Sequence, residues 1–283
     1  MNINTIMKGA AVGSLCFLAA CGTNESNDSL GEIEIGYNNW AENIAVTNMW
    51  KILLEEQGYD VTITPLEKAP IWSAVANDNI DIGMEIWLPI TDEPFYDEYH
   101  EDIHIGEMWF EGANLGFAVP DYMPITSIDE LDTVYDEING EITGIEAGAS
   151  ISELADQTLE HYGLEVSQTN SSEAAMMTAL DTAYQAEEPI VVAMWNPHWA
   201  FAEYDIRYLD DPEGTFGEPD DIFFMTRTGF PEDHPDILDW LNTWEMDDEN
   251  LGELMAMINE QGEEEGASQW IEENRETIDS WIQ

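Results

Sequence analysis

The chain has 283 residues, 44% of them hydrophobic, and carries 61 acidic but only 6 basic side chains, for a formal net charge of -55. The apolar share excludes a disordered chain, and the length allows one large domain or two medium ones. The negative charge excludes nucleic acids and anionic lipid headgroups as partners and is typical of an acidic coat in a saline exterior, where salt screens the repulsion.

The N-terminus has the pattern of a targeting segment. Residues 1–8 contain one Lys, and residues 9–20 form an apolar run that is too short for a permanent membrane span. The run ends in Leu-Ala-Ala-Cys-Gly at 18–22, which resembles the bacterial lipobox. This resemblance implies a lipoprotein signal peptide at 1–20, a lipid on Cys21 and a polar tether at 21–30. Cys16 leaves with the signal peptide, so we expect no disulfide.

Strand-like and helix-like segments alternate after the tether. Three segments have strand patterns and two have helical spacing between them, in the order 32–37, 40–57, 61–66, 71–77 and 80–87. This β-α-β-α-β order predicts a mainly parallel sheet covered by helices.

The same order recurs in the second half of the chain, at 141–146, 151–162, 165–169, 172–186 and 190–195. The third strand of each half ends on Trp-x-Pro, at 87–89 and at 195–197. Two similar lobes are therefore predicted, and a short-period repeat protein is not.

Two apolar segments connect the lobes. Residues 115–120 lead out of the first lobe and residues 221–226 lead back, which predicts a hinge and a cleft between lobe 1, at 31–118 plus 222–283, and lobe 2, at 119–221. The C-terminal stretch from Pro235 is helical and amphipathic, with four tryptophans expected to pack against a core: Trp240, Trp244, Trp270 and Trp281.

Three other tryptophans, Trp40, Trp87 and Trp195, are expected just beyond strand ends, where ligands of open α/β sheets bind. Most tryptophans pack in a core, but loops at strand ends are exposed. Indole faces attract cations that cannot form hydrogen bonds, and a trimethylammonium group is such a cation. We therefore expect an aromatic site for a quaternary ammonium compound.

Six motifs resemble the glycine betaine/proline betaine substrate-binding proteins of ABC importers. They are GYNNWAE at 36–42, EIWLP at 85–89, GIEAGASI at 144–151, SSEAAM at 171–176, WNPHW at 195–199 and YLDDP at 208–212. The resemblance extends from about residue 31 to the C-terminal helices. It implies an α/β, type II periplasmic-binding-protein-like fold that closes on its ligand. It also implies a monomer that has no cofactor and no enzymatic activity. Such a protein lies on the outer side of the cell membrane and delivers its ligand to an ABC permease with its ATPase subunit.

By the same resemblance, Trp40, Trp87 and Trp195 form the aromatic cage, and the backbone N–H groups of Ser150 and Ile151 hold the ligand carboxylate. A helix starting near Ser150 would present free N–H groups there. One position departs from the family, which often has a His where this chain has Asp92. An ionised Asp92 would repel a carboxylate, so it either points away or accepts a hydroxyl proton from choline or carnitine. Glycine betaine is the expected ligand, with choline or carnitine as alternatives.

An enzyme and a sensor remain as other classes. Residues 100–104 match H-E-x-x-H, the zinc protease pattern, but their flanks are acidic and 102–106 alternates like a strand or loop. A chance match is therefore favoured over a lipid-anchored metallohydrolase. A lipid-anchored sugar-acting protein that uses paired carboxylates is the other enzyme alternative. A sensor that reports ligand to a membrane partner would need the same binding site.

Overall fold

The computed structural model describes residues 29–283. The predicted signal peptide, Cys21 and most of the predicted tether lie outside the described residues. Within 29–283, no helix combines the length and the apolar character that a membrane span requires.

Lobe 1 is built on the first β-α-β-α-β unit. Its strands β1 (Glu32–Tyr37), β2 (Asp60–Pro65) and β3 (Ile82–Leu88) alternate with helices α1 (Ala41–Glu56) and α2 (Lys68–Ala76). Strand β1 pairs in parallel with both β2 and β3, as the pattern predicts. A further helix, α3 (Glu93–Tyr99), follows β3 and was not predicted.

Lobe 2 repeats this order with shorter strands. It contains β5 (Glu141–Thr143), α4 (Ser150–Tyr162), β6 (Ser167–Thr169), α5 (Glu173–Ala186) and β7 (Val192–Asn196). Strand β5 pairs in parallel with β6 and β7. A 3-10 helix precedes the unit, and a short helix and strand follow it: η1 (Ile128–Val134), α6 (Ala200–Glu203) and β8 (Ile206–Tyr208).

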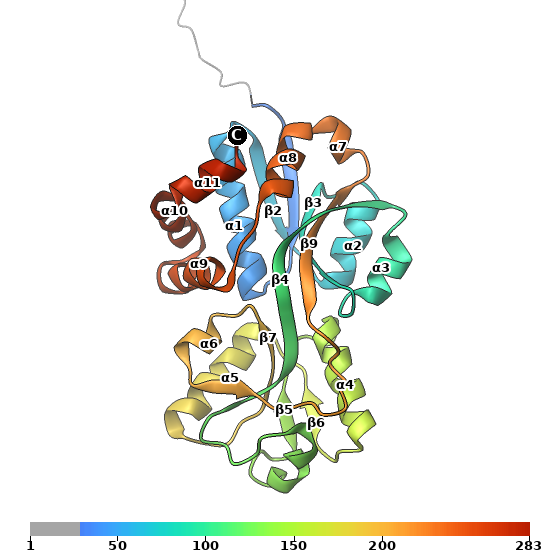
Figure 1. Ribbon diagram of the computed structural model, residues 1–283, viewed down its shortest axis with the longest axis vertical. Coiled ribbons are helices and arrows are strands. Elements are labelled where there is room, and N and C mark those ends of the chain that lie inside the picture. Colours follow the sequence, from blue (N-terminus) through green and yellow to red (C-terminus); the bar gives the residue numbers. More distant parts are fainter. Residues whose placement is uncertain (1–28) are drawn as a thin grey trace, which may run out of the picture.

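One long strand, β4 (Ile103–Pro120), belongs to both lobes (Figure 1). Up to Ala113 it pairs with β9 (Asp220–Arg227), and from Asn114 it pairs with β7. The sequence pattern predicts a strand from 115 and leaves 102–106 as a strand or a loop. Register shifts between β4 and β9 interrupt the two-residue alternation, which hides the first half of the strand from pattern analysis.

The strands form one continuous sheet in the order β2-β1-β3-β9-β4-β7-β5-β6. Strands β2, β1 and β3 at one end belong to lobe 1, and strands β7, β5 and β6 at the other end belong to lobe 2. Strands β9 and β4 lie between these two groups. This is the predicted α/β architecture of two lobes joined by two crossing strands.

The C-terminal helices return to lobe 1 (Figure 1). They are α7 (Phe230–Asp233), α8 (Pro235–Thr243), α9 (Asp248–Gln261), α10 (Glu263–Glu273) and α11 (Arg275–Trp281). Helices α9 and α10 pack on α1. Of the four tryptophans expected in this core, Trp244, Trp270 and Trp281 are buried, whereas Trp240 is half-buried at the margin.

Trp244 joins the C-terminal helices to the sheet. Its ring stacks on Trp109 of β4 at a centroid distance of 4.4 Å and meets the edge of Trp50 of α1 at 5.6 Å. All three rings are almost fully buried. Aromatic pairs of this kind contribute about 0.5–1.5 kcal/mol beyond the burial of their area.

Replacing Trp244 by Ala is expected to lower the free energy of unfolding by about 3–5 kcal/mol, since the large cavity left behind cannot collapse fully. Urea denaturation at high salt measures the change. Trp240→Ala is the matched control and should cost less, because that ring is half-buried. Equal losses in the two variants would show that the Trp244 stack does not hold the helices to the sheet.

Candidate ligand-binding site

A cavity lies where the two lobes meet, and its space, counted together with the adjoining open solvent, is about 310 Å³. Five of the six predicted ligand-binding residues line it: Trp40, Trp87, Ser150, Ile151 and Trp195. The other lining residues are Glu42, Lys68, Thr91, Leu115 and Ile145.

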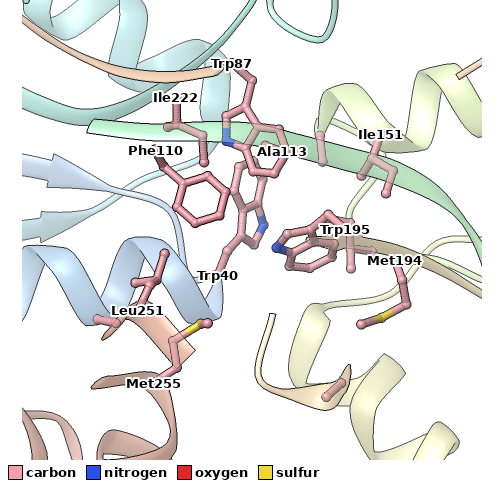
Figure 2. Packing of buried hydrophobic residues seen from close by; sticks show 14 of the residues in the cluster. Trp40, Trp87, Phe110, Ala113, Ile151, Met194, Trp195, Ile222, Leu251 and Met255 are labelled. Carbon is pink, nitrogen blue, oxygen red and sulfur yellow. The ribbon is translucent and has the colours of Figure 1, made fainter. Parts of the chain in front are cut away.

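The three tryptophans come from different elements and gather at this cavity (Figure 2). Trp40 precedes the first residue of α1, while Trp87 lies in β3 and Trp195 in β7. The prediction that all three lie beyond strand ends is therefore wrong for Trp87 and Trp195. Both occupy the second-last position of a strand, because each strand pairs on up to the residue before its proline.

The rings are buried rather than exposed, with 7%, 4% and 3% of Trp40, Trp87 and Trp195 accessible. The centroids of Trp40 and Trp195 are 6.4 Å apart with the ring planes at 58°. Tilted, desolvated rings of this kind present their faces to a common space, which strengthens attraction for a cation.

Hydrogen bonds cross between the lobes in both directions. The indole N–H of Trp40, in lobe 1, donates to Glu146 of lobe 2 at 2.7 Å. The indole N–H of Trp195, in lobe 2, donates to Glu42 of lobe 1 at 2.8 Å. Each ring is thus held by a carboxylate of the opposite lobe, and the Lys68 ammonium lies over the Trp40 ring, 5.3 Å from its centroid.

Two more contacts join the lobes beside the rings. The backbone N–H of Ala41 donates to Glu173 at 2.9 Å, and the Ser150 hydroxyl donates to Asp92 at 3.0 Å. The arrangement therefore corresponds to a closed cleft.

Burial raises the pKa values of two carboxyl groups near the cavity, Glu42 and Glu85. Burial raises the pKa of Glu42 well above its usual value, and the negative charges of Glu85 and Glu173 raise it further. Burial also raises the pKa of Glu85, to about 7, against the lowering effect of Lys68. One oxygen of Glu42 has no hydrogen-bond partner among residues 29–283. Burial thus disfavours the charged form of both carboxyls.

Asp92 lies behind the cavity and does not line it. Its side chain is fully buried and accepts hydrogen bonds from the backbone N–H of Trp87 at 2.9 Å and from the Ser150 hydroxyl. It also forms a salt bridge of 2.6 Å with Lys68. The sequence left two arrangements open, in which Asp92 either points away from the ligand or accepts a hydrogen bond from a ligand hydroxyl. In the structure its carboxylate points to partners within the chain.

Ser150 and Ile151 are the first two residues of α4. Backbone N–H groups in the first turn of a helix have no acceptor within the helix, and they face an anion favourably. Both residues line the cavity, so the start of α4 lies against the space beside the indole rings.

Sequence analysis did not single out Lys68, Glu42 or Thr91. Glu42 is two residues from Trp40 in the same motif, and Lys68 begins a helix just beyond strand β2, so position at a strand end was an available signal. No local signal identified Thr91, whose backbone N–H and hydroxyl donate to Asp220, far away in the sequence.

The H-E-x-x-H pattern does not form a metal site. His100 follows the end of α3, whereas His104 lies in β4, so the two are not on one helical face. Within the described range, no cluster of three His, Cys, Asp or Glu side chains could hold a metal ion. His198 is buried and bonded to Glu173 and to the Ala200 N–H, outside the lining of the cavity.

Known proteins share both the sequence pattern and the fold. Residues 31–273 match the family model described as the substrate-binding domain of ABC-type glycine betaine transport systems. The chain is 35% identical over 150 residues to the glycine betaine/carnitine transport binding protein GbuC of Listeria monocytogenes, a match that covers 52% of this chain and 50% of that protein. The match thus spans about half the length of this curated relative.

Two solved structures agree over most of both chains. Lactococcal OpuAC, in its closed conformation with glycine betaine, is 32% identical and superimposes with a TM-score of 0.84 over 89% of this chain and all of that one. The glycine betaine/L-proline-binding protein ProX of Borrelia burgdorferi is also 32% identical, with a TM-score of 0.85 over 89% and 97% of the two chains. The fold is that of type II periplasmic binding proteins. The family is one of substrate-binding proteins and not of enzymes, and this chain belongs to it as a substrate-binding domain of the ABC-type glycine betaine transport systems.

Proposed function

We propose that this protein captures glycine betaine, or a closely related quaternary ammonium solute, outside the cell membrane and delivers it to an ABC permease and its ATPase. The observation that carries the proposal is one cavity lined by Trp40, Trp87 and Trp195 together with Ser150 and Ile151 at the start of α4. In a saline exterior such a solute would serve osmoprotection.

The proposed ligand matches the two kinds of wall. A trimethylammonium group cannot form hydrogen bonds, and each indole face contributes about 0.5–2 kcal/mol to binding it when water is excluded. A carboxylate is stabilised by the free N–H groups of a helix start. Choline and carnitine share the ammonium group and are the alternative ligands. The relative GbuC is named for carnitine as well as glycine betaine.

We propose further that residues 31–118 with 222–283, and residues 119–221, are the two bodies that close on the ligand as a monomer. Four of the hydrogen bonds between the lobes lie beside the tryptophan rings and support closure as the step that completes the cage. A sensor that passes ligand status to a membrane partner would close in the same way, and a transport assay with the permease separates the two roles.

Calorimetry at high salt with glycine betaine, proline betaine, carnitine and choline is the direct test of the ligand class. Trp40→Ala, Trp87→Ala and Trp195→Ala should each weaken binding of glycine betaine about 10- to 100-fold, since 1.4 kcal/mol corresponds to tenfold. Each ring is buried, so folding is checked by circular dichroism. Full affinity in all three folded variants would rule out the aromatic cage.

Glu146 is expected to act on the closed state. Glu146→Ala removes the acceptor of the Trp40 indole N–H, and we expect the ligand to dissociate about tenfold faster, because a hydrogen bond to a charged group contributes about 1.5–3 kcal/mol. Glu146→Gln keeps an acceptor oxygen and should change less. Stopped-flow tryptophan fluorescence measures the rates, and unchanged dissociation in Glu146→Ala would contradict the role in closure.

Cys21 is proposed to hold the protein on the membrane through a lipid. Cys21→Ser should abolish incorporation of labelled palmitate and shift the protein from the membrane fraction to the medium. Cys16→Ser is the matched control and should leave both unchanged, because Cys16 leaves with the predicted signal peptide. Continued lipid incorporation in Cys21→Ser would refute the assignment.

A further inference from the structure

Lys68 is the unexpected member of the cavity wall. The described range contains five of the six basic residues, and Lys68 is the buried one among them, with 3% of its side chain accessible. Burying a charge costs free energy unless it is paired, so a chain with few cations gains little stability by placing one here. The position is better explained by a ligand than by folding.

Asp92 orients the Lys68 ammonium and leaves some of its N–H donors available. The salt bridge between Lys68 and Asp92 is 2.6 Å long, and the same carboxylate is also held by the Trp87 N–H and the Ser150 hydroxyl. A lysine ammonium has three N–H donors. Lys68 can therefore keep its salt bridge and donate a further hydrogen bond into the cavity that it lines.

The position of this ammonium relative to the cage favours one kind of ligand. The Lys68 nitrogen is 5.3 Å from the centroid of the Trp40 ring. A ligand with only a positive charge would bring its ammonium group near that of Lys68, and like charges at short range repel each other. A zwitterion adds a carboxylate that attracts Lys68 while its ammonium occupies the remaining indole faces.

We propose that Lys68, oriented by Asp92, binds the carboxylate of the ligand beside the Ser150 and Ile151 amides and so selects zwitterionic betaines over simple cations such as choline. This inference rests on the proposed function, because it places the trimethylammonium group in the tryptophan cage. It assigns to Asp92 the role of a positioning residue, which acts through Lys68.

The first arm of the test uses the unaltered protein and two ligands. Glycine betaine and choline share the trimethylammonium group and differ in having a carboxylate or a hydroxyl. Calorimetry at high salt should show glycine betaine binding at least about tenfold more tightly. Equal affinities would overturn the role of Lys68 and leave the proposed function standing, whereas binding of neither ligand nor any other quaternary ammonium solute would refute the proposed function itself.

The second arm removes the charge pair as a unit. The double variant Lys68→Met/Asp92→Asn removes both charges of the pair together. Glu85, whose pKa burial already raises to about 7, then loses the nearby Lys68 charge and is expected to be protonated, so the variant should fold. We expect its glycine betaine affinity to fall about 10- to 100-fold and its choline affinity to stay or rise. Lys51→Met is the matched control, since Lys51 pairs with Glu55 on α1 away from the cavity, and it should change neither affinity.

A structural role would give a different result. If the pair only supports the cavity wall, both ligands should lose affinity by the same factor in the double variant. That outcome would overturn the proposal, as would unchanged glycine betaine affinity. If the double variant does not fold, Lys68→Gln/Asp92→Asn is measured with the same two ligands, because it also leaves neither partner of the pair charged. It removes the charge but keeps a donor of similar reach, and it should shift the affinity ratio toward choline.

Discussion

Two hydrogen bonds between indole N–H groups and carboxylates of the opposite lobe determine the geometry of the site. Trp40 donates to Glu146 and Trp195 donates to Glu42, so each lobe fixes an aromatic ring of the other. We propose that the ring surfaces turned to the cavity attract the ligand cation. The three rings lie together only when the lobes are closed. In this proposal binding and closure are coupled, because the same two rings serve both.

The scarcity of positive charge makes each basic side chain informative. The five in the described range all form salt bridges with carboxylates, and the remaining one, Lys8, lies outside it. Salt bridges at the surface contribute little to stability, so four of these pairs have mainly local effects. The fifth, between Lys68 and Asp92, lies at the wall of the ligand cavity, where water does not screen it. Most acidic side chains of the coat are exposed and have no basic partner, because the cations are so few. The Asp92 charge at the site is buried and paired with Lys68.

Two groups of buried tryptophans lie in different places in the fold. Trp244, Trp109 and Trp50 pack against one another in lobe 1 and join the C-terminal helices to the sheet. Trp40, Trp87 and Trp195 line the cavity between the lobes. All six are buried, so burial by itself does not distinguish a core residue from a ligand residue. All six belong to the same apolar core, and the distinction is that Trp40, Trp87 and Trp195 also line the cavity between the lobes.

The sequence by itself determined the α/β order, the two lobes and five of the residues that line the cavity. Strand and helix patterns reflect local periodicity, and Trp40, Trp87, Trp195, Ser150 and Ile151 lie in motifs that a single sequence displays. Tertiary structure alone decided the first half of β4, where register shifts break the alternation, and the partners of Asp92. Lys68 is 24 positions before Asp92 and Ser150 is 58 after it, so no local pattern relates the three. Only the folded chain brings them together, because closing the lobes places the start of α4 against the end of β3.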